Sequence, residues 1–165
     1  MSAETITTAL FLITAVVASA VLINAVYPVI QNMAGTFSSS THESDVRIRT
    51  DFKIIATSAN SSGTAQVWMK NIGSERISLS EIQRADVFCG KVGSFDHLTY
   101  TNGSLVNTKW TADFGPGYDL NTNSYWDSGE TLKVNAKTSI SSGDKVYFQF
   151  ALPNGIWRSN EFTAS

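Results

Sequence analysis

The sequence predicts an α+β protein in which a long hydrophobic N-terminal α-helix is followed by an antiparallel β-sandwich domain. Two observations concern charge: the segment Thr7–Met33 contains no charged residue, and all Lys and Arg residues lie at Arg47 or later. The third is the alternation of apolar and polar residues in the charged part of the chain. We therefore expect a hydrophobic helix over residues 1–36, a Ser/Thr-rich neck over 37–46 and the sandwich over 47–165.

The predicted helix is long and apolar enough to cross a membrane. Only Thr14, Ser19 and Asn24 interrupt the apolar run between Ala9 and Tyr27, and a run of about 18 to 20 apolar residues matches the hydrocarbon core of a bilayer. A secretory signal peptide would begin with a basic region, whereas residues 1–6 contain no Lys or Arg. We therefore expect the segment to be retained.

Small side chains recur along this helix, at Ala15, Ala18, Ser19 and Ala25. The spacing of Ala15 and Ser19 is a small-xxx-small pattern, which lets helix backbones approach each other closely. It favours packing against other helices, although Ala and Ser are also common in any membrane helix. Pro28 has no amide hydrogen, so we expect a kink or a looser turn just before it.

Five segments of alternating residues predict strands of the sandwich. They are DVRIRTDFKII (45–55), AQVWMKNI (65–72), ADVFCGKV (85–92), TLKVNAKT (131–138) and KVYFQFAL (145–152), with turn signals at 61–63, 103, 115–117 and 142–143. The expected core residues are Leu132, Val134, Val146, Phe148, Phe150, Trp68 and Trp157, and Tyr147 and Gln149 should face outward.

The charge content argues against nucleic acid as a partner. The chain has 12 Lys+Arg against 14 Asp+Glu, a net charge of -2, and its positive residues are scattered along the sequence. Cys89 is the single cysteine, so an intrachain disulfide and a Cys-based zinc cluster are excluded. We expect Cys89 to be a small core residue.

No catalytic motif is recognisable, and we expect the protein not to be an enzyme. His42 lies in the Ser-rich neck and His97 beside a turn, and neither belongs to a metal-binding, nucleophile-elbow or phosphate-binding pattern. Both are expected to be solvated.

The segment DLNTNSYWDSGE, residues 119–130, has the ligand spacing of an EF-hand-type calcium loop. The candidate ligands for a structural Ca²⁺ are Asp119, Asn121, Asn123, Tyr125 through its backbone carbonyl, Asp127 and Glu130. Ser124 replaces the glycine usual at the sixth position, and strands rather than helices flank the loop. The alternative interpretation is a polar, Asn-rich turn between strands.

Two N-glycosylation sequons begin at Asn60 and Asn102, and both fall at predicted turns. Together with the low charge and the abundance of Ser, Thr and Asn, they indicate an extracellular surface domain.

The layout as a whole resembles a known family. The segments that carry the resemblance are LFLITAVVASAVLINAVYPVIQ, RIRTDFKIIATSA, VWMKNIGSERI, YWDSGETL and LPNGI. They are similar to archaeal flagellins (archaellins) and accessory archaellum proteins, which belong to the type IV pilin-like superfamily. The chain lacks the Gly-rich opening of major archaeal flagellins and is nearer to the accessory protein called G. The resemblance implies an immunoglobulin-like or archaellin-like sandwich, and a leader removed by a prepilin-type peptidase.

The resemblance also implies how the protein works. The helix would anchor the subunit in the membrane before assembly and form the filament core afterwards, and Glu4 would meet the amino terminus of a neighbouring copy. The expected function is therefore a structural subunit of the archaellum filament, a helical homopolymer at the cell surface that serves swimming motility. The alternative is a membrane-anchored accessory or stator component whose sandwich binds the surface layer and other archaellum subunits. A third reading, an adhesin or carbohydrate-binding module, would use exposed Trp110, Tyr118 or Trp126.

Overall fold

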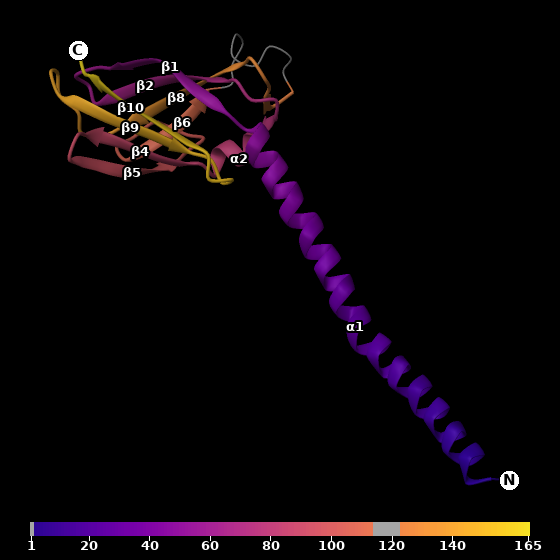
Figure 1. The fold of residues 1–165 in the computed structure, drawn as a ribbon. Coiled ribbons are helices and arrows are strands. Elements are labelled where there is room, and N and C mark those ends of the chain that lie inside the picture. The colour runs from indigo at the N-terminus through magenta and orange to yellow at the C-terminus, as the bar shows by residue number, and fades with distance from the viewer. Residues whose placement is uncertain (1, 114–122) are drawn as a thin grey trace. The chain divides into compact units, whose positions relative to one another are not determined.

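The computed structural model describes residues 2–113 and 123–165, and the chain divides into two compact units, Met1–Ser44 and Asp45–Ser165 (Figure 1). The N-terminal element is a single helix, α1, which spans Ala3–Arg49 and contains Pro28 in its interior. None of its side chains is buried, and it is long and apolar enough to cross a membrane. The predicted fold class, a long apolar helix before a mostly antiparallel β-sheet domain, is confirmed.

Helix α1 continues through the segment expected to be a neck, residues 37–46, and it ends after the first part of the first expected strand, 45–55. The hydroxyl groups there donate to carbonyls one turn earlier, Ser39 Oγ to Gly35 O at 2.9 Å and Thr41 Oγ1 to Phe37 O at 2.8 Å. These bonds satisfy the short polar side chains within the helix, so a Ser/Thr-rich composition does not end it here.

The second unit contains one eight-stranded sheet with the order β1-β2-β8-β6-β5-β4-β9-β10. Its strands are β1 (Phe52–Ala59), β2 (Thr64–Asn71), β4 (Asp86–Lys91), β5 (Ser94–Tyr100), β6 (Lys109–Asp113), β8 (Thr131–Lys137), β9 (Lys145–Ala151) and β10 (Trp157–Thr163). All neighbours are antiparallel except β5 and β6. A short ribbon of β3 (Ile77–Ser78) and β7 (Tyr125–Trp126), with helix α2 (Leu79–Gln83), completes the unit.

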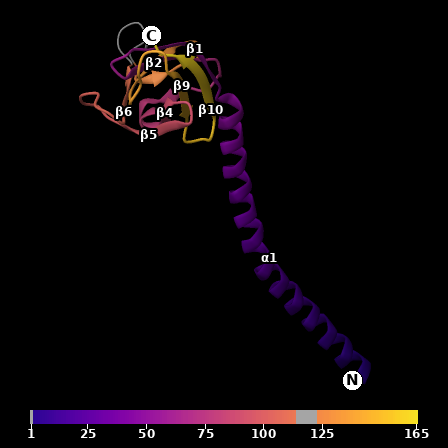
Figure 2. The same ribbon diagram turned by 90° about the vertical axis from the view of Figure 1, so that its left-hand side faces the viewer.

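The sheet curls until its two edge strands approach each other, which makes the domain nearly barrel-shaped (Figures 1 and 2). The Nη2 atom of Arg158, the second residue of β10, lies 2.5 Å from Oδ1 of Asp51, which directly precedes β1. At the other end, the amide of Ser165 donates to the carbonyl of Ala59 at 3.0 Å. The predicted sandwich is therefore one continuous sheet whose two halves face each other across the core.

Alternate residues of the strands fill this core, as the period of a half-buried strand requires. Phe150 is fully buried, and its ring packs edge-to-face on Phe52 at 5.6 Å and on Trp110 at 5.9 Å. The predicted core positions Val146, Phe148, Phe150, Leu132 and Val134 are all buried, and Tyr147 and Gln149 are on the other face.

The two tryptophans expected in the core are not there, and this prediction was wrong. Trp68 is half-buried on the outer face of β2, and Trp157 is 53% exposed at the start of β10. Cys89 is fully buried as expected, and its burial raises the pKa of the thiol to about 12.

Candidate assembly surfaces

The surface of α1 is the largest apolar surface of the described residues. Large side chains such as Leu10, Phe11 and Val21 are more than half exposed, and they lie all around the helix. A helix that is apolar on every side needs an apolar surrounding, which is either lipid or other helices. The residues predicted for assembly, Glu4, Ala15, Ala18, Ser19 and Ala25, are all exposed. At 3.6 residues per turn they share a stripe of about 120°.

A second apolar surface lies on the outer side of β4, β5 and β9, and we call it the aromatic face. It consists of Phe88, Phe95, His97 and Tyr147. The ring of Phe95 is 4.9 Å from that of Tyr147 and 6.3 Å from that of Phe88, and Phe88 stacks on His97 at 4.9 Å. Phe95 is 48% exposed. The solvent side of an antiparallel sheet is ordinarily polar, so this chain of rings is a candidate contact surface.

The strand register explains why these rings meet. Gly90 of β4 is paired with Phe95 on one side and with Tyr147 on the other. A Cβ atom at position 90 would lie 3.1 Å from the Cβ of Phe95 and 2.7 Å from its Cα. Because glycine has no side chain, the rings of Phe95 and Tyr147 come together across β4.

Two polar pairs lie at the edge of the aromatic face, and one of them is formed by its member His97. His97 Nε2 lies 2.9 Å from Asp86 Oδ1, and Lys145 Nζ lies 2.6 Å from Glu161 Oε2. An apolar, aromatic centre with a polar rim is the usual composition of a protein–protein contact. His97 is exposed, as expected from the sequence, and its ring belongs to the aromatic face.

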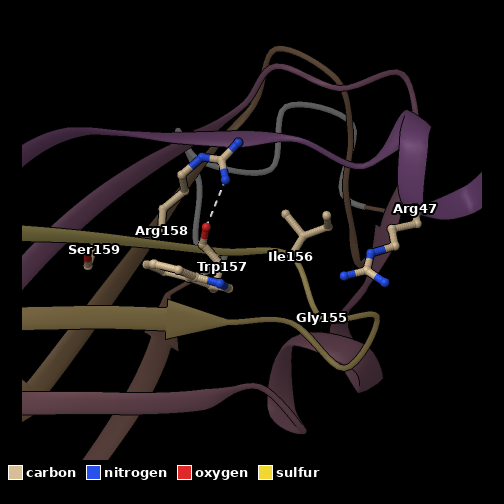
Figure 3. Close-up of a pocket in the computed structure, with 6 residues that line it drawn as sticks. All are labelled: Arg47, Gly155, Ile156, Trp157, Arg158 and Ser159. Carbon is tan, nitrogen blue, oxygen red and sulfur yellow. Dashed lines mark hydrogen bonds between the residues drawn. The ribbon is translucent and has the colours of Figure 1, made fainter.

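A shallow pocket of about 510 Å³ lies beside the loop between β9 and β10 (Figure 3). Its lining residues are Arg47, Gly155, Ile156, Trp157, Arg158 and Ser159. Arg158 is held in place, because its Nη1 donates to the carbonyl of Trp157 at 2.8 Å and its Nη2 pairs with Asp51. The lining has no carboxylate, thiol or imidazole, so it lacks the usual groups for acid–base catalysis.

Part of the candidate calcium loop lies outside the described residues, namely Asp119 and Asn121. In the described part, Asn123 Nδ2 donates to Asp127 Oδ2 at 2.7 Å, and the amide of Asp127 donates to Glu130 Oε2 at 2.9 Å. The amide of Tyr125 donates to Asn123 Oδ1 at 2.8 Å. Calcium binding stays a prediction, and the described polar groups of the loop bond to one another.

Ser124, which stands where such a loop has glycine, adopts a φ of 63°. This is the left-handed conformation that glycine adopts without strain. The departure from the usual sequence is therefore compatible with the backbone geometry of the turn.

Both predicted glycosylation sites are exposed and lie at turns, as expected. Asn60 Oδ1 accepts a hydrogen bond from Ser62 Oγ at 2.6 Å, and Asn102 Oδ1 accepts one from Tyr100 at 2.6 Å. Whether they carry glycans stays a prediction.

Two of the three side chains named for the adhesin reading are not on the surface. Trp110 and Trp126 are fully buried, and Trp126 Nε1 donates to the carbonyl of Glu130. Tyr118 lies outside the described residues. In the described residues, no group of three or more His, Cys, Asp or Glu side chains is placed to hold a metal ion.

Comparison with known proteins gives the surfaces a context. The model of archaeal-type flagellins matches residues 2–162 of this chain. The chain belongs to the archaeal-type flagellin family. This is a structural family without enzymatic activity, which agrees with the absence of catalytic motifs, and the protein is an archaellum-related, flagellin-like protein.

Three individual proteins are similar over different parts of the chain. An uncharacterized protein of Archaeoglobus fulgidus is 29% identical over 168 residues, which cover 98% of both chains. The archaellum periplasmic stator protein FlaG of Sulfolobus acidocaldarius is 26% identical, with a TM-score of 0.54, over 68% of this chain and 99% of that one. The archaeal flagellum of Methanospirillum hungatei has the same fold, with 16% identity and a TM-score of 0.55 over 94% of this chain and 93% of that one.

Proposed function

We propose that this protein is a membrane-anchored accessory component of the archaellum, with a stator-like role at the cell surface. Helix α1 holds it in the membrane, and the sheet domain contacts other archaellum proteins or the surface layer. The function is mechanical, because the protein transmits force through contacts and catalyses no reaction.

The observation that carries this proposal is the difference between the two structural comparisons. The stator protein FlaG is 26% identical to this chain and is matched over 99% of its length, whereas the filament protein is 16% identical and shares the fold alone. FlaG also occurs in a complex with FlaF, for which the match covers 87% of that chain. A stator-like component needs such a protein partner.

The surfaces of the described residues fit this role. In the aromatic face, Phe95 is 48% exposed, and two polar pairs lie at the edge of this face. Such a surface gains free energy when a partner covers it, at about 25 cal/mol per Å² of apolar area. Helix α1 is long and apolar enough to lie in lipid, as an anchor requires.

The second candidate function is the filament subunit expected from the sequence. It is favoured by the fold similarity to the archaeal flagellum, which extends over 94% of this chain and therefore includes part of the helix. In that role the stripe of small residues on α1 would pack against the helices of identical copies, because small side chains allow close helix packing.

Cell fractionation separates the two functions. Filaments are sheared from cells that produce the chain with a C-terminal epitope tag, and the tag is measured in the filament and envelope fractions. We expect it to remain with the envelope. Recovery of the chain as the main component of sheared filaments would contradict the stator-like role and support the filament role. The Ala18→Arg variant is the matched control, because a charge in the middle of the membrane segment should release the chain from both fractions.

A further inference from the structure

Lysines that are far apart in the sequence gather on one side of the sheet. The outer surface of β1, β2, β8 and β6, which we call the lysine face, carries five of the seven lysines of the chain: Lys53, Lys70, Lys109, Lys133 and Lys137. Their alternation with buried residues such as Val134 and Ala136 places them on the solvent side. The positive charge that is scattered in the sequence is therefore concentrated by the strand register.

This arrangement sets like charges directly opposite each other. Lys53 is the register partner of Lys70, and Lys109 is the register partner of Lys137. Such directly opposed like charges destabilise a sheet. In the described strand residues of this face, Asp113, opposite Lys133, is the one carboxylate. The excess of positive charge is thus local, since the whole chain has a net charge of -2.

The protection of sheet edges does not explain these residues. Lysines on an edge strand prevent aggregation, and Lys53 on β1 fits that role. However, β8 and β6 are interior strands of the sheet, and they carry Lys133, Lys137 and Lys109. Lysines on interior strands that lower the stability of the sheet therefore indicate that their charge has a function.

The centre of the lysine face has the features of a contact surface. Trp68 is half-buried, and Lys133 Nζ lies 5.3 Å from the centre of its ring. Beside them, Gln66 Nε2 donates to Asn135 Oδ1 at 3.2 Å. The pair Lys53 and Lys70 lies at one end of the face and the pair Lys109 and Lys137 at the other. Six strand residues at about 3.3 Å each separate the two pairs, which is a distance of about 20 Å. A centre with Trp68, Lys133 and a hydrogen-bonded amide pair, lying between the two positive pairs, fits a partner of the opposite charge.

We propose that the lysine face docks an acidic protein surface. An anionic lipid surface fits less well, because membrane-surface binding combines basic residues with several protruding apolar side chains. Among the large apolar side chains of β1, β2, β6 and β8, Ile55 alone is more than half exposed, and Trp68 lies half-buried on the sheet. The acidic partner relieves the repulsion within the two lysine pairs. The inference does not depend on whether the protein is a stator-like component or a filament subunit.

Binding of poly-L-glutamate to the full chain in an uncharged detergent tests this proposal. We expect binding that weakens steeply between about 0.05 M and about 0.5 M salt, as contacts between exposed charges do. The variant Lys109→Gln/Lys137→Gln should bind at least about tenfold more weakly. The matched control is Arg84→Gln/Lys91→Gln, which removes the same charge outside the lysine face, where Arg84 Nε donates to the carbonyl of Ser80 and Lys91 pairs with Asp144. It should bind like the wild type.

Thermal unfolding of the same proteins separates a docking role from a structural one. Because Lys109→Gln/Lys137→Gln removes a like-charge pair, this variant should unfold at the same temperature as the wild type or at a higher one, although it binds more weakly. Equal loss of binding in the control, or the absence of salt-sensitive binding in the wild type, would overturn the proposal. Binding to phosphatidylglycerol vesicles without binding to poly-L-glutamate would also overturn it and would identify a lipid surface instead.

Discussion

Two single substitutions, one on each side of the same sheet, distinguish residues needed for folding from residues needed for assembly. Phe150 is fully buried between Phe52 and Trp110, whereas Phe95 is 48% exposed on the aromatic face. Removing a buried phenylalanine side chain costs about 3 to 5 kcal/mol, because a cavity remains. We therefore expect Phe150→Ala to lower the free energy of unfolding by about this amount, which is a large part of the roughly 5 to 15 kcal/mol typical of domains.

Phe95→Ala should cost much less. About half of its side chain is already in water, so the loss is about half of the 1.5 to 3 kcal/mol for a fully buried side chain, and water fills the space that is left. We expect a loss of about 1 kcal/mol, to which the weakened contacts with Phe88 and Tyr147 add a few tenths. Assembly should be affected strongly by Phe95→Ala, because the ring of Phe95 is the most exposed part of the proposed contact.

Urea unfolding of the full chain in detergent, followed by tryptophan fluorescence, measures the first effect. Chemical cross-linking in cells, followed by recovery of the tagged chain, measures how many archaellum proteins remain attached. Phe95→Ala should leave the protein folded but recover fewer partners. If it unfolds the protein as much as Phe150→Ala does, or if partner recovery is unchanged, the assignment of the aromatic face as a contact surface is wrong.

Four further predictions follow from the same structure. Ala18→Arg should leave urea unfolding of the sheet domain unchanged but remove the chain from membrane fractions, and normal membrane retention would exclude α1 as the anchor. A calcium chelator should lower the melting temperature of the wild type but not of Asp119→Ala, whereas equal curves would favour a plain turn. The raised pKa of the Cys89 thiol, about 12, favours the neutral form in the folded state, so stability should fall as the pH rises from about 9 toward 12 and should fall less in Cys89→Ala. Substitution of Asn60 and Asn102 by Gln should lower the mass of the chain purified from its natural host stepwise, and an unchanged mass would show that neither carries a glycan.

Local patterns predicted the elements whose side chains follow a simple period. The charge-free run identified α1, and the alternation in KVYFQFAL placed Phe148 and Phe150 correctly in the core. The end of α1 was not predictable in this way, because Ser and Thr favour turns yet also bond back to carbonyls within a helix. Strand β10 was missed because five of its seven side chains are exposed in succession and show no alternation.

The contact surfaces could not be predicted, because they depend on which strands are neighbours. Phe95 and Tyr147 are 52 residues apart in the sequence and meet only through the pairing of both strands with β4. Lys53 and Lys70 belong to neighbouring strands, but Lys109 and Lys137 join their face through the order β1-β2-β8-β6. The strand order places β8 between β2 and β6, and no local pattern encodes this arrangement.

The position of the protein on intact cells tests the central claim most directly. Gold-labelled antibodies against the C-terminal tag, viewed by electron microscopy, should mark the cell envelope at the base of the archaella. Labelling at regular intervals along the whole length of the filaments would contradict the stator-like role.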